Sequence, residues 1–139
     1  MSEQTPAYPD PPAPDSPDRY GLLLSRDLIF TTKITETARS LGFAMTTAGN
    51  SALVKATIER GKPRVVFVDL AAGDLVVPTR IVEYRELAGD SVPFVAFGSH
   101  VDTGALASAR AAGCVEVMPR SRFSGELIDI IRRYIGDMK

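Results

Sequence analysis

The sequence is poor in the residues that build metal sites and disulfide frameworks. It has 139 residues with one cysteine (Cys114), one histidine (His100) and no tryptophan. A single cysteine excludes an internal disulfide, and a single histidine excludes a Cys/His-rich metal centre. No apolar run approaches the ~20 residues that span a bilayer, and the N-terminus lacks the basic-then-apolar pattern of a signal peptide. We therefore expect a cytoplasmic protein that has no membrane contact and holds no metal or cofactor.

A strong charge of either sign is also missing. Sixteen basic and 17 acidic residues give a formal net charge of -1. Domains that bind nucleic acid are usually strongly basic, so this balance argues against such a partner. The hydrophobic share of 45% and the charged share of 24% are those of ordinary globular proteins. At this length we expect one folded domain.

Residues 1–19 differ from the rest of the chain. They contain six of the ten prolines and few large apolar side chains. Such a segment cannot offset its ordering entropy, so we expect a disordered tail with polyproline II character. Four acids and one arginine give this tail a net charge of -3, which leaves residues 20–139 with 15 basic and 13 acidic residues, a net of +2. A spacer is favoured over a docking peptide, because no basic-flanked PxxP motif is present.

Beyond the tail, short apolar runs alternate with segments whose apolar residues recur at helical spacing. Strands are predicted at 20–24, 43–47, 64–70, 92–97 and 114–118. Helices are predicted at 27–41, 51–60, 77–87, 102–112 and 124–134. This alternation predicts an α/β fold, with a five-stranded parallel sheet covered by helices on both faces. Right-handed crossovers favour the flavodoxin-like strand order 2-1-3-4-5.

Residues 20–139 resemble the receiver domain of response regulators. The resemblance rests on the order of elements, on Asp69 at the end of the third strand, and on the Ala112–Gly113 step before the fifth. It implies that Asp69 stands at the phosphoacceptor position. It further implies two Mg²⁺-binding acids after the first strand, a Thr or Ser after the fourth, and a Lys–Pro pair after the fifth. These groups have a physical role, because a carboxylate accepts phosphate poorly unless a metal and a cation neutralise the transferring group.

The sequence departs from that pattern at the acidic pair. Ser25 and Arg26 occupy those two positions, and Asp27 comes one position late, at the start of the first helix. A guanidinium at this point is expected to pair with Asp69 and hold the site without metal. We therefore predict an atypical receiver, or pseudo-receiver.

The other two positions also differ. Gly98 replaces the Thr or Ser, with Ser99 next to it, and either Met118–Pro119 or Arg120–Ser121 replaces Lys–Pro. The polar segments 97–102 and 119–123 follow neighbouring strands, so they are expected to face each other.

Several residues of these segments have structural roles to play. Arg120 is expected to reach Asp69 or Asp102, and Asp102 to cap the fourth helix. His100 is expected to be an ordinary loop histidine. Arg120 and Ser121 are expected to join the fifth strand to the last helix, with Ser121 or Ser124 as its cap.

Catalysis is not expected. Ser99, His100 and Asp102 are nearly consecutive, whereas the members of a catalytic triad must point toward one another. The favoured hypothesis is a stand-alone two-component signalling module that acts by binding proteins, with a possible homodimer through the fourth helix, fifth strand and fifth helix. Two alternatives stay open. One is a phospho-receiver with Asp27 and Asp74 as substitute metal ligands, and the other is a small-ligand site at the strand ends.

Overall fold

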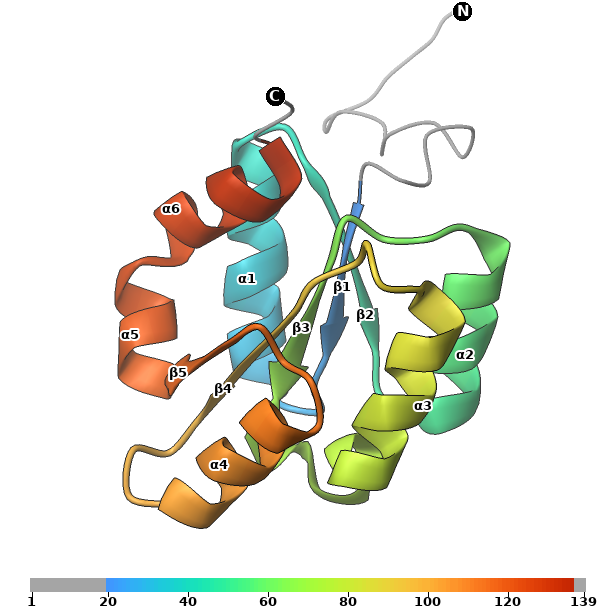
Figure 1. Cartoon of the computed structure of the whole chain (residues 1–139). Coiled ribbons are helices and arrows are strands. Elements are labelled where there is room, and N and C mark those ends of the chain that lie inside the picture. The colour runs from blue at the N-terminus through green and yellow to red at the C-terminus, as the bar shows by residue number, and fades with distance from the viewer. Residues whose placement is uncertain (1–19, 137–139) are drawn as a thin grey trace, which may run out of the picture.

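The sheet is the framework of the molecule, which is known from a computed structural model that describes residues 20–136. Its five parallel strands have the order β2-β1-β3-β4-β5, as Figure 1 shows. The strands are β1 (Tyr20–Leu24), β2 (Ala44–Ala48), β3 (Val65–Asp69), β4 (Phe94–Gly98) and β5 (Glu116–Pro119). The predicted α/β fold and strand order are confirmed. The predicted tail, residues 1–19, lies outside the described residues.

Helices cover both faces of the sheet, so that the fold has three layers (Figure 1). Helices α2, α3 and α4 lie on one face, and α1, α5 and α6 lie on the other. The helical elements are α1 (Leu28–Ser40), α2 (Ser51–Arg60), the 3-10 segment η2 (Leu70–Val76), α3 (Pro78–Ala88), α4 (Thr103–Ala111), α5 (Arg120–Gly125), α6 (Leu127–Ile131) and the π-helical segment η3 (Arg132–Gly136). Among residues 20–136, no helix has the length and apolar character needed to cross a membrane.

The strands read as continuous apolar runs because both of their faces are buried. Successive side chains point to opposite faces. Leu22 and Leu24 therefore enter the core under α2, α3 and α4, while Leu23 enters the core under α1, α5 and α6. All five residues of β1, β3 and β4 are buried. This rigid centre holds the carboxyl ends of the strands at one edge of the sheet.

Side chains cap three of the helices, and the cap at Asp102 was predicted. Asp27, Asn50 and Asp102 each accept a hydrogen bond from a backbone N–H in the first turn of α1, α2 and α4. Such caps satisfy amide groups that have no partner inside the helix.

The C-terminal helix is where the prediction was wrong. A single helix was expected at 124–134, but α5 begins directly at Arg120, after Pro119, whose φ of -63° suits a helix start. Glu126 then leaves helical geometry, with φ -110° and ψ 21°, and α6 follows as a separate segment. The expected cap at Ser121 or Ser124 is absent, because no side chain caps α5.

Candidate functional site

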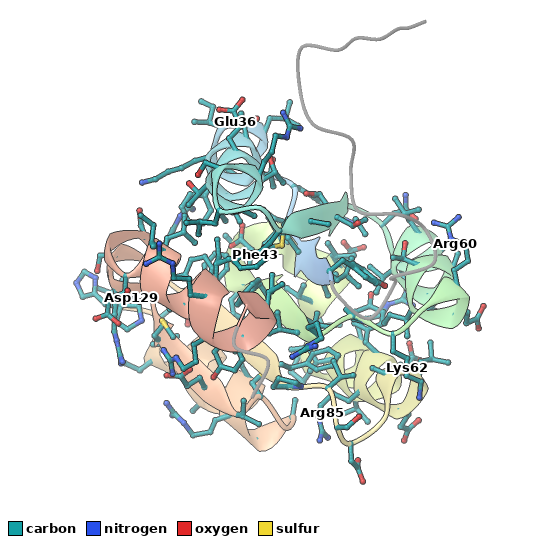
Figure 2. All side chains as sticks on the ribbon, turned by 90° about the horizontal axis from the view of Figure 1, so that it is seen from above. Glu36, Phe43, Arg60, Lys62, Arg85 and Asp129 are labelled. Atoms are coloured by element: carbon teal, nitrogen blue, oxygen red, sulfur yellow. The ribbon has the colours of Figure 1, made fainter. Side chains whose placement is uncertain are left out.

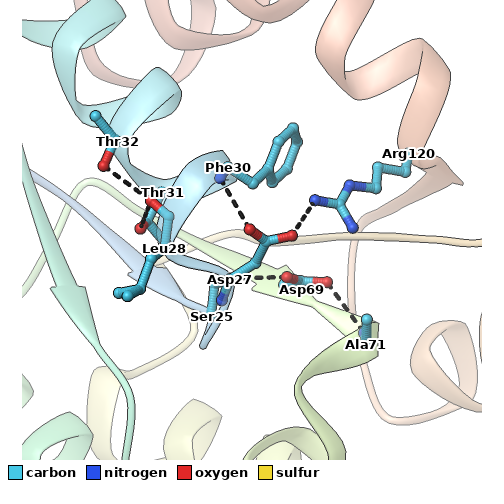
Figure 3. A network of polar contacts seen from close by, with 9 residues as sticks. All are labelled: Ser25, Asp27, Leu28, Phe30, Thr31, Thr32, Asp69, Ala71 and Arg120. Carbon is cyan, nitrogen blue, oxygen red and sulfur yellow. Dashed lines mark hydrogen bonds and ion pairs between the residues drawn. The ribbon is translucent and has the colours of Figure 1, made fainter.

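The centre of the candidate site is Asp69 at the carboxyl end of β3. The residue is 1% exposed and Ser25, at the end of β1, is 2% exposed. The Ser25 hydroxyl donates to Asp69 Oδ2 at 2.7 Å, and the Ala71 N–H donates to Oδ1 at 3.0 Å. Figure 3 shows both contacts. The two carboxylate oxygens are therefore each bound by a group of the protein itself.

Ser25 is held in turn by the start of α1. Its Oγ accepts a hydrogen bond from the backbone N–H of Asp27 at 3.2 Å. The hydroxyl thus accepts on one side and donates to Asp69 on the other, so its proton has a defined direction. A serine at the end of a buried strand fits this position, because its short side chain reaches the neighbouring parallel strand.

Arg26 does not pair with Asp69, so that prediction was wrong. Its Nη1 donates to Asp74 at 2.8 Å and to the Ala72 carbonyl at 3.2 Å, and its Nε donates to the Gly49 carbonyl at 2.9 Å. The guanidinium ties the end of β2 to the segment that follows β3. Its hydrogen bond holds the pKa of the Asp74 carboxyl below the usual range.

The backbone at Gly73 shapes the segment that receives Arg26. The φ angle of +65° there lies in a region that L side chains rarely adopt, and it kinks η2 between two short turns. A Cβ at Gly73 would lie 3.9 Å from Arg26 Nη1. A loop was expected in this region, and the kink brings Asp74 back toward β1.

Arg120 binds Asp27, and not Asp69 or Asp102, the two partners that were expected. Its Nη2 donates to Asp27 Oδ2 at 2.7 Å, and its guanidinium carbon lies 4.0 Å from the centre of the Phe30 ring (Figure 3). Asp27 also caps α1 by accepting from the Phe30 N–H at 3.0 Å. The pKa of Asp27 is lowered, first by the hydrogen bond from Arg120 and then by that from Phe30.

Gly98 at the end of β4 lacks the side-chain hydroxyl of the Thr or Ser that the resemblance implies at this position. A Cβ at Gly98 would lie 3.1 Å from Leu70 Cβ, so the Leu70 side chain takes the space above this position. Leu70 was not predicted as a site residue, although its apolar side chain directly follows Asp69 in the sequence.

The predicted segment 97–102 forms the loop between β4 and α4. Ser99 is exposed and its Oγ accepts from the Val101 N–H at 3.4 Å. His100 is exposed, and Asp102 caps α4 through the Ala105 N–H at 3.1 Å. The cap role predicted for Asp102 is confirmed. Arg120, which was expected to reach Asp69 or Asp102, binds Asp27 instead. Ser121 is exposed on the first turn of α5.

The donor set does not fit the Mg²⁺ site that the resemblance implies. Mg²⁺ is bound by carboxylate and other oxygen ligands. Here Asp27 and Asp74, the two substitute ligands considered, each hold an arginine at 2.7 to 2.8 Å. Within the described part of the chain, no group of three or more His, Cys, Asp or Glu side chains is placed to hold a metal ion.

Replacing Arg120 with glutamine is expected to raise the pKa of Asp27 toward its ordinary value of 3.8. A carboxyl whose pKa is lowered on folding stabilises the fold above its unfolded pKa, and that contribution is lost as the pH falls through the folded pKa. The variant should therefore lose less stability on acidification below about pH 4 than the parent. Carbon NMR titration of the carboxyl group measures the pKa directly. Arg122→Gln, which removes the partner of Glu126, is the control. An unchanged Asp27 pKa in Arg120→Gln would show that the ion pair is absent in solution.

No family model matches this chain, and no curated protein matches it. Among solved structures, a response regulator from Thermotoga maritima is similar, with a TM-score of 0.70 and 19% identity over 85% of this chain and 98% of that one. A second similar structure is the receiver domain of the sensor histidine kinase PA1611 from Pseudomonas aeruginosa PAO1, which has a magnesium ion in its active-site cleft. Its TM-score is 0.69 and its sequence identity 23%, over 86% of this chain and 98% of that one.

A third similar structure is a complex. The Saccharomyces cerevisiae receiver domain of Ssk1, crystallised with the histidine phosphotransfer protein Ypd1, gives a TM-score of 0.71 and 15% identity over 86% of this chain and 90% of that one. This chain has the receiver fold. The resemblance inferred from Asp69 and the Ala112–Gly113 step is confirmed at the level of the fold.

Proposed function

We propose that the protein is a signalling module that acts by binding other proteins, without Mg²⁺-dependent phosphorylation of Asp69. One observation carries the proposal. Arg26 stands where the receiver pattern has a metal-binding acid, and its guanidinium is bound to Asp74 and to two backbone carbonyls. A fixed positive charge takes the place of a metal ligand. These contacts hold the segment that follows Asp69, at Ala72 and Asp74, against Gly49 after the end of β2.

The contacts of Asp69 also support a function that does not involve phosphorylation of this residue. Phosphoryl transfer requires a metal and a cation placed against the transferring group. Here the carboxylate is 1% exposed and accepts hydrogen bonds from Ser25 and Ala71. The nearby cation Arg120 is bound to Asp27 and stacked on Phe30. An incoming phosphoryl group would have to displace these contacts.

Phosphorylation by a small donor tests the proposal. The full chain is incubated with acetyl phosphate and Mg²⁺, and its intact mass is followed with time. We expect no phosphorylated species. A phosphorylated form that accumulates in the parent and is lost in Asp69→Asn would overturn the proposal. A typical receiver domain, treated in parallel, shows that the donor is active.

The face formed by α4 and β5 is the proposed contact surface, including contact with a second copy of the chain. Small side chains such as Ala107 and Ala111 are exposed on α4, and Val101 and Val115 at its two ends are 75% and 62% exposed. Exposed apolar side chains next to small residues allow close approach of a partner. The complex of the Ssk1 receiver with Ypd1 shows that a receiver fold can bind another protein. Light scattering across a concentration series should give a mass above that of one chain, which Ala111→Glu lowers. A monomer at every concentration would reject the homodimer.

Ser25→Ala is expected to destabilise the fold by about 1.5–3 kcal/mol, the range for losing a hydrogen bond to a buried charged group. The alanine leaves Asp69 Oδ2 without the donor that now lies 2.7 Å away. Urea denaturation measures the loss. Ser124→Ala is the matched control, because Ser124 Oγ accepts only an exposed hydrogen bond from Lys33 and should cost less than about 0.5 kcal/mol. Equal effects of the two substitutions would mean that Ser25 does not support Asp69.

A further inference from the structure

A basic groove lies at the amino edge of the sheet, opposite the edge that holds Asp69. It is lined by Phe43, Arg132, Arg133 and Gly136. Figure 2 looks onto this edge, with Phe43 near the middle of the view, between α1 and the C-terminal helical segment. The lining combines one aromatic ring with two guanidinium groups. This combination suits a ligand that carries both apolar rings and negative charge.

Two glycines bring the C-terminal segment close to the strands and so create the groove. A Cβ on Gly136 would collide with the ring of Phe43, and a Cβ on Gly21 would lie 2.7 Å from Ile135 Cδ1. In the parallel register of β1 and β2, Tyr20 is level with Ala44. Phe43 therefore lies beside the point at which residues 1–19 join the domain.

The charge of this edge is set by the direction of the helices. Each helix runs opposite to the strands, so the carboxyl ends of α1, α2 and α3 lie at the amino edge. Each has an arginine in its last turn, at Arg39, Arg60 and Arg85, where the helix dipole favours a cation. Figure 2 labels the basic residues Arg60, Lys62 and Arg85 in this view, and also the acidic residues Glu36 and Asp129. The Glu116 carboxylate accepts a hydrogen bond from Arg133 at 3.3 Å and from Tyr134 at 2.5 Å.

The segment that joins the domain here has the complementary composition. Residues 1–19 carry four acids against one arginine, a net charge of -3. Tyr8, Pro11, Pro14 and Pro17 recur every three residues, and Asp15 and Asp18 have the same spacing. A polyproline II helix has three residues per turn and a rise of about 3.1 Å per residue, so it would align the four ring-bearing residues in one row and set the two carboxylates about 9 Å apart in another.

We propose that residues 14–18 of the same chain bind in this groove. Pro17 packs on the Phe43 ring, as proline-rich segments do on aromatic grooves, and Asp15 and Asp18 pair with the guanidinium groups of Arg132 and Arg133. These residues precede Tyr20 by two to six positions. An extended chain covers that separation in about 6–19 Å, so the segment is close enough to bind without strain. The proposal is independent of the fate of Asp69.

Backbone NMR relaxation of the full chain tests this docking. We expect order parameters near 0.85 for Ser16 and Asp18, the value of a rigid backbone, and a fall below about 0.6 in the double variant Asp15→Asn/Asp18→Asn. The Phe43 and Gly136 amide signals should shift in the same variant. Glu3→Gln/Asp10→Asn removes as much charge from the distal part of the tail and should leave the order parameters unchanged. Arg132→Glu should release the segment as the double variant does.

Three results would overturn the proposal. The first is an order parameter below about 0.6 in the parent protein. The second is an equal change of the order parameters in Asp15→Asn/Asp18→Asn and in Glu3→Gln/Asp10→Asn, which would mean that only the overall charge of the tail matters. The third is contact between chains, detected in a mixture of isotope-labelled and unlabelled protein. That result would assign the groove to the tail of a second copy.

Discussion

Replacing Phe123 with alanine is expected to lower the free energy of unfolding by about 3–5 kcal/mol, the usual cost of truncating a fully buried phenylalanine. Phe123 is 0% exposed. Its ring stacks on Phe97 with centroids 4.1 Å apart, and it meets Phe67 edge-on at 5.3 Å and Phe30 at 6.2 Å. Alanine would leave a cavity among three rings that belong to β3, β4 and α1.

The loss should extend to the site, because Phe123 anchors the short helix α5, which begins with Arg120. Urea denaturation measures the stability, and the Asp27 pKa reports whether Arg120 still binds that carboxylate. Ile128→Ala on α6, whose side chain is 48% exposed, is the control and should cost much less. A loss below about 1 kcal/mol for Phe123→Ala would show that α5 is not packed as described.

The double substitution Ser25→Asp/Arg26→Asp is expected to create Mg²⁺ affinity that the parent protein lacks. It places two carboxylates after β1, beside Asp69, and removes the guanidinium that now binds Asp74. Mg²⁺ prefers such oxygen ligands and needs only one or two carboxylates besides water. We expect binding to tighten at least tenfold, equivalent to about 1.4 kcal/mol. Calorimetric titration with MgCl₂ measures it.

The matched control is Ser25→Asn/Arg26→Asn, which has the same side-chain shape without the negative charge. It should bind Mg²⁺ no better than the parent. If both double variants bind equally, the gain comes from the loss of Arg26 alone. If neither binds, the departure at Ser25 and Arg26 is not what separates this protein from the Mg²⁺-binding pattern.

Much of the fold could be predicted because strands that are buried on both faces appear in the sequence as continuous apolar runs. The run at 64–70 predicted a strand buried on both faces, and β3 at Val65–Asp69 is buried throughout. Asp102 predicted a helix start, because its side chain can bind a backbone amide a few residues away, as it does at Ala105. These are local signals, and the parallel sheet follows from their alternation.

The partners of the arginines could not be predicted in the same way. Asp69 and Asp74 lie close together in sequence, and Arg26 binds Asp74, which follows the backbone kink at Gly73. Arg120 binds Asp27, which is 93 positions away. A long arginine side chain can reach several carboxylates with a similar free energy, so the local backbone conformation decides which carboxylate it binds. The break at Glu126 directly follows Gly125, a glycine inside a helical pattern that was the available sequence signal for it.

The most direct test of the central claim is the amide spectrum of the full chain during titration with Mg²⁺ and then with beryllofluoride, which mimics a phosphoryl group. The signals to follow are those of Ser25, Asp69 and Ala71, which share the hydrogen bonds of the site. We expect these signals to show no more than the small, non-saturating shift that added salt causes. A saturable shift at millimolar Mg²⁺ or below, or a new set of signals with beryllofluoride, would contradict it.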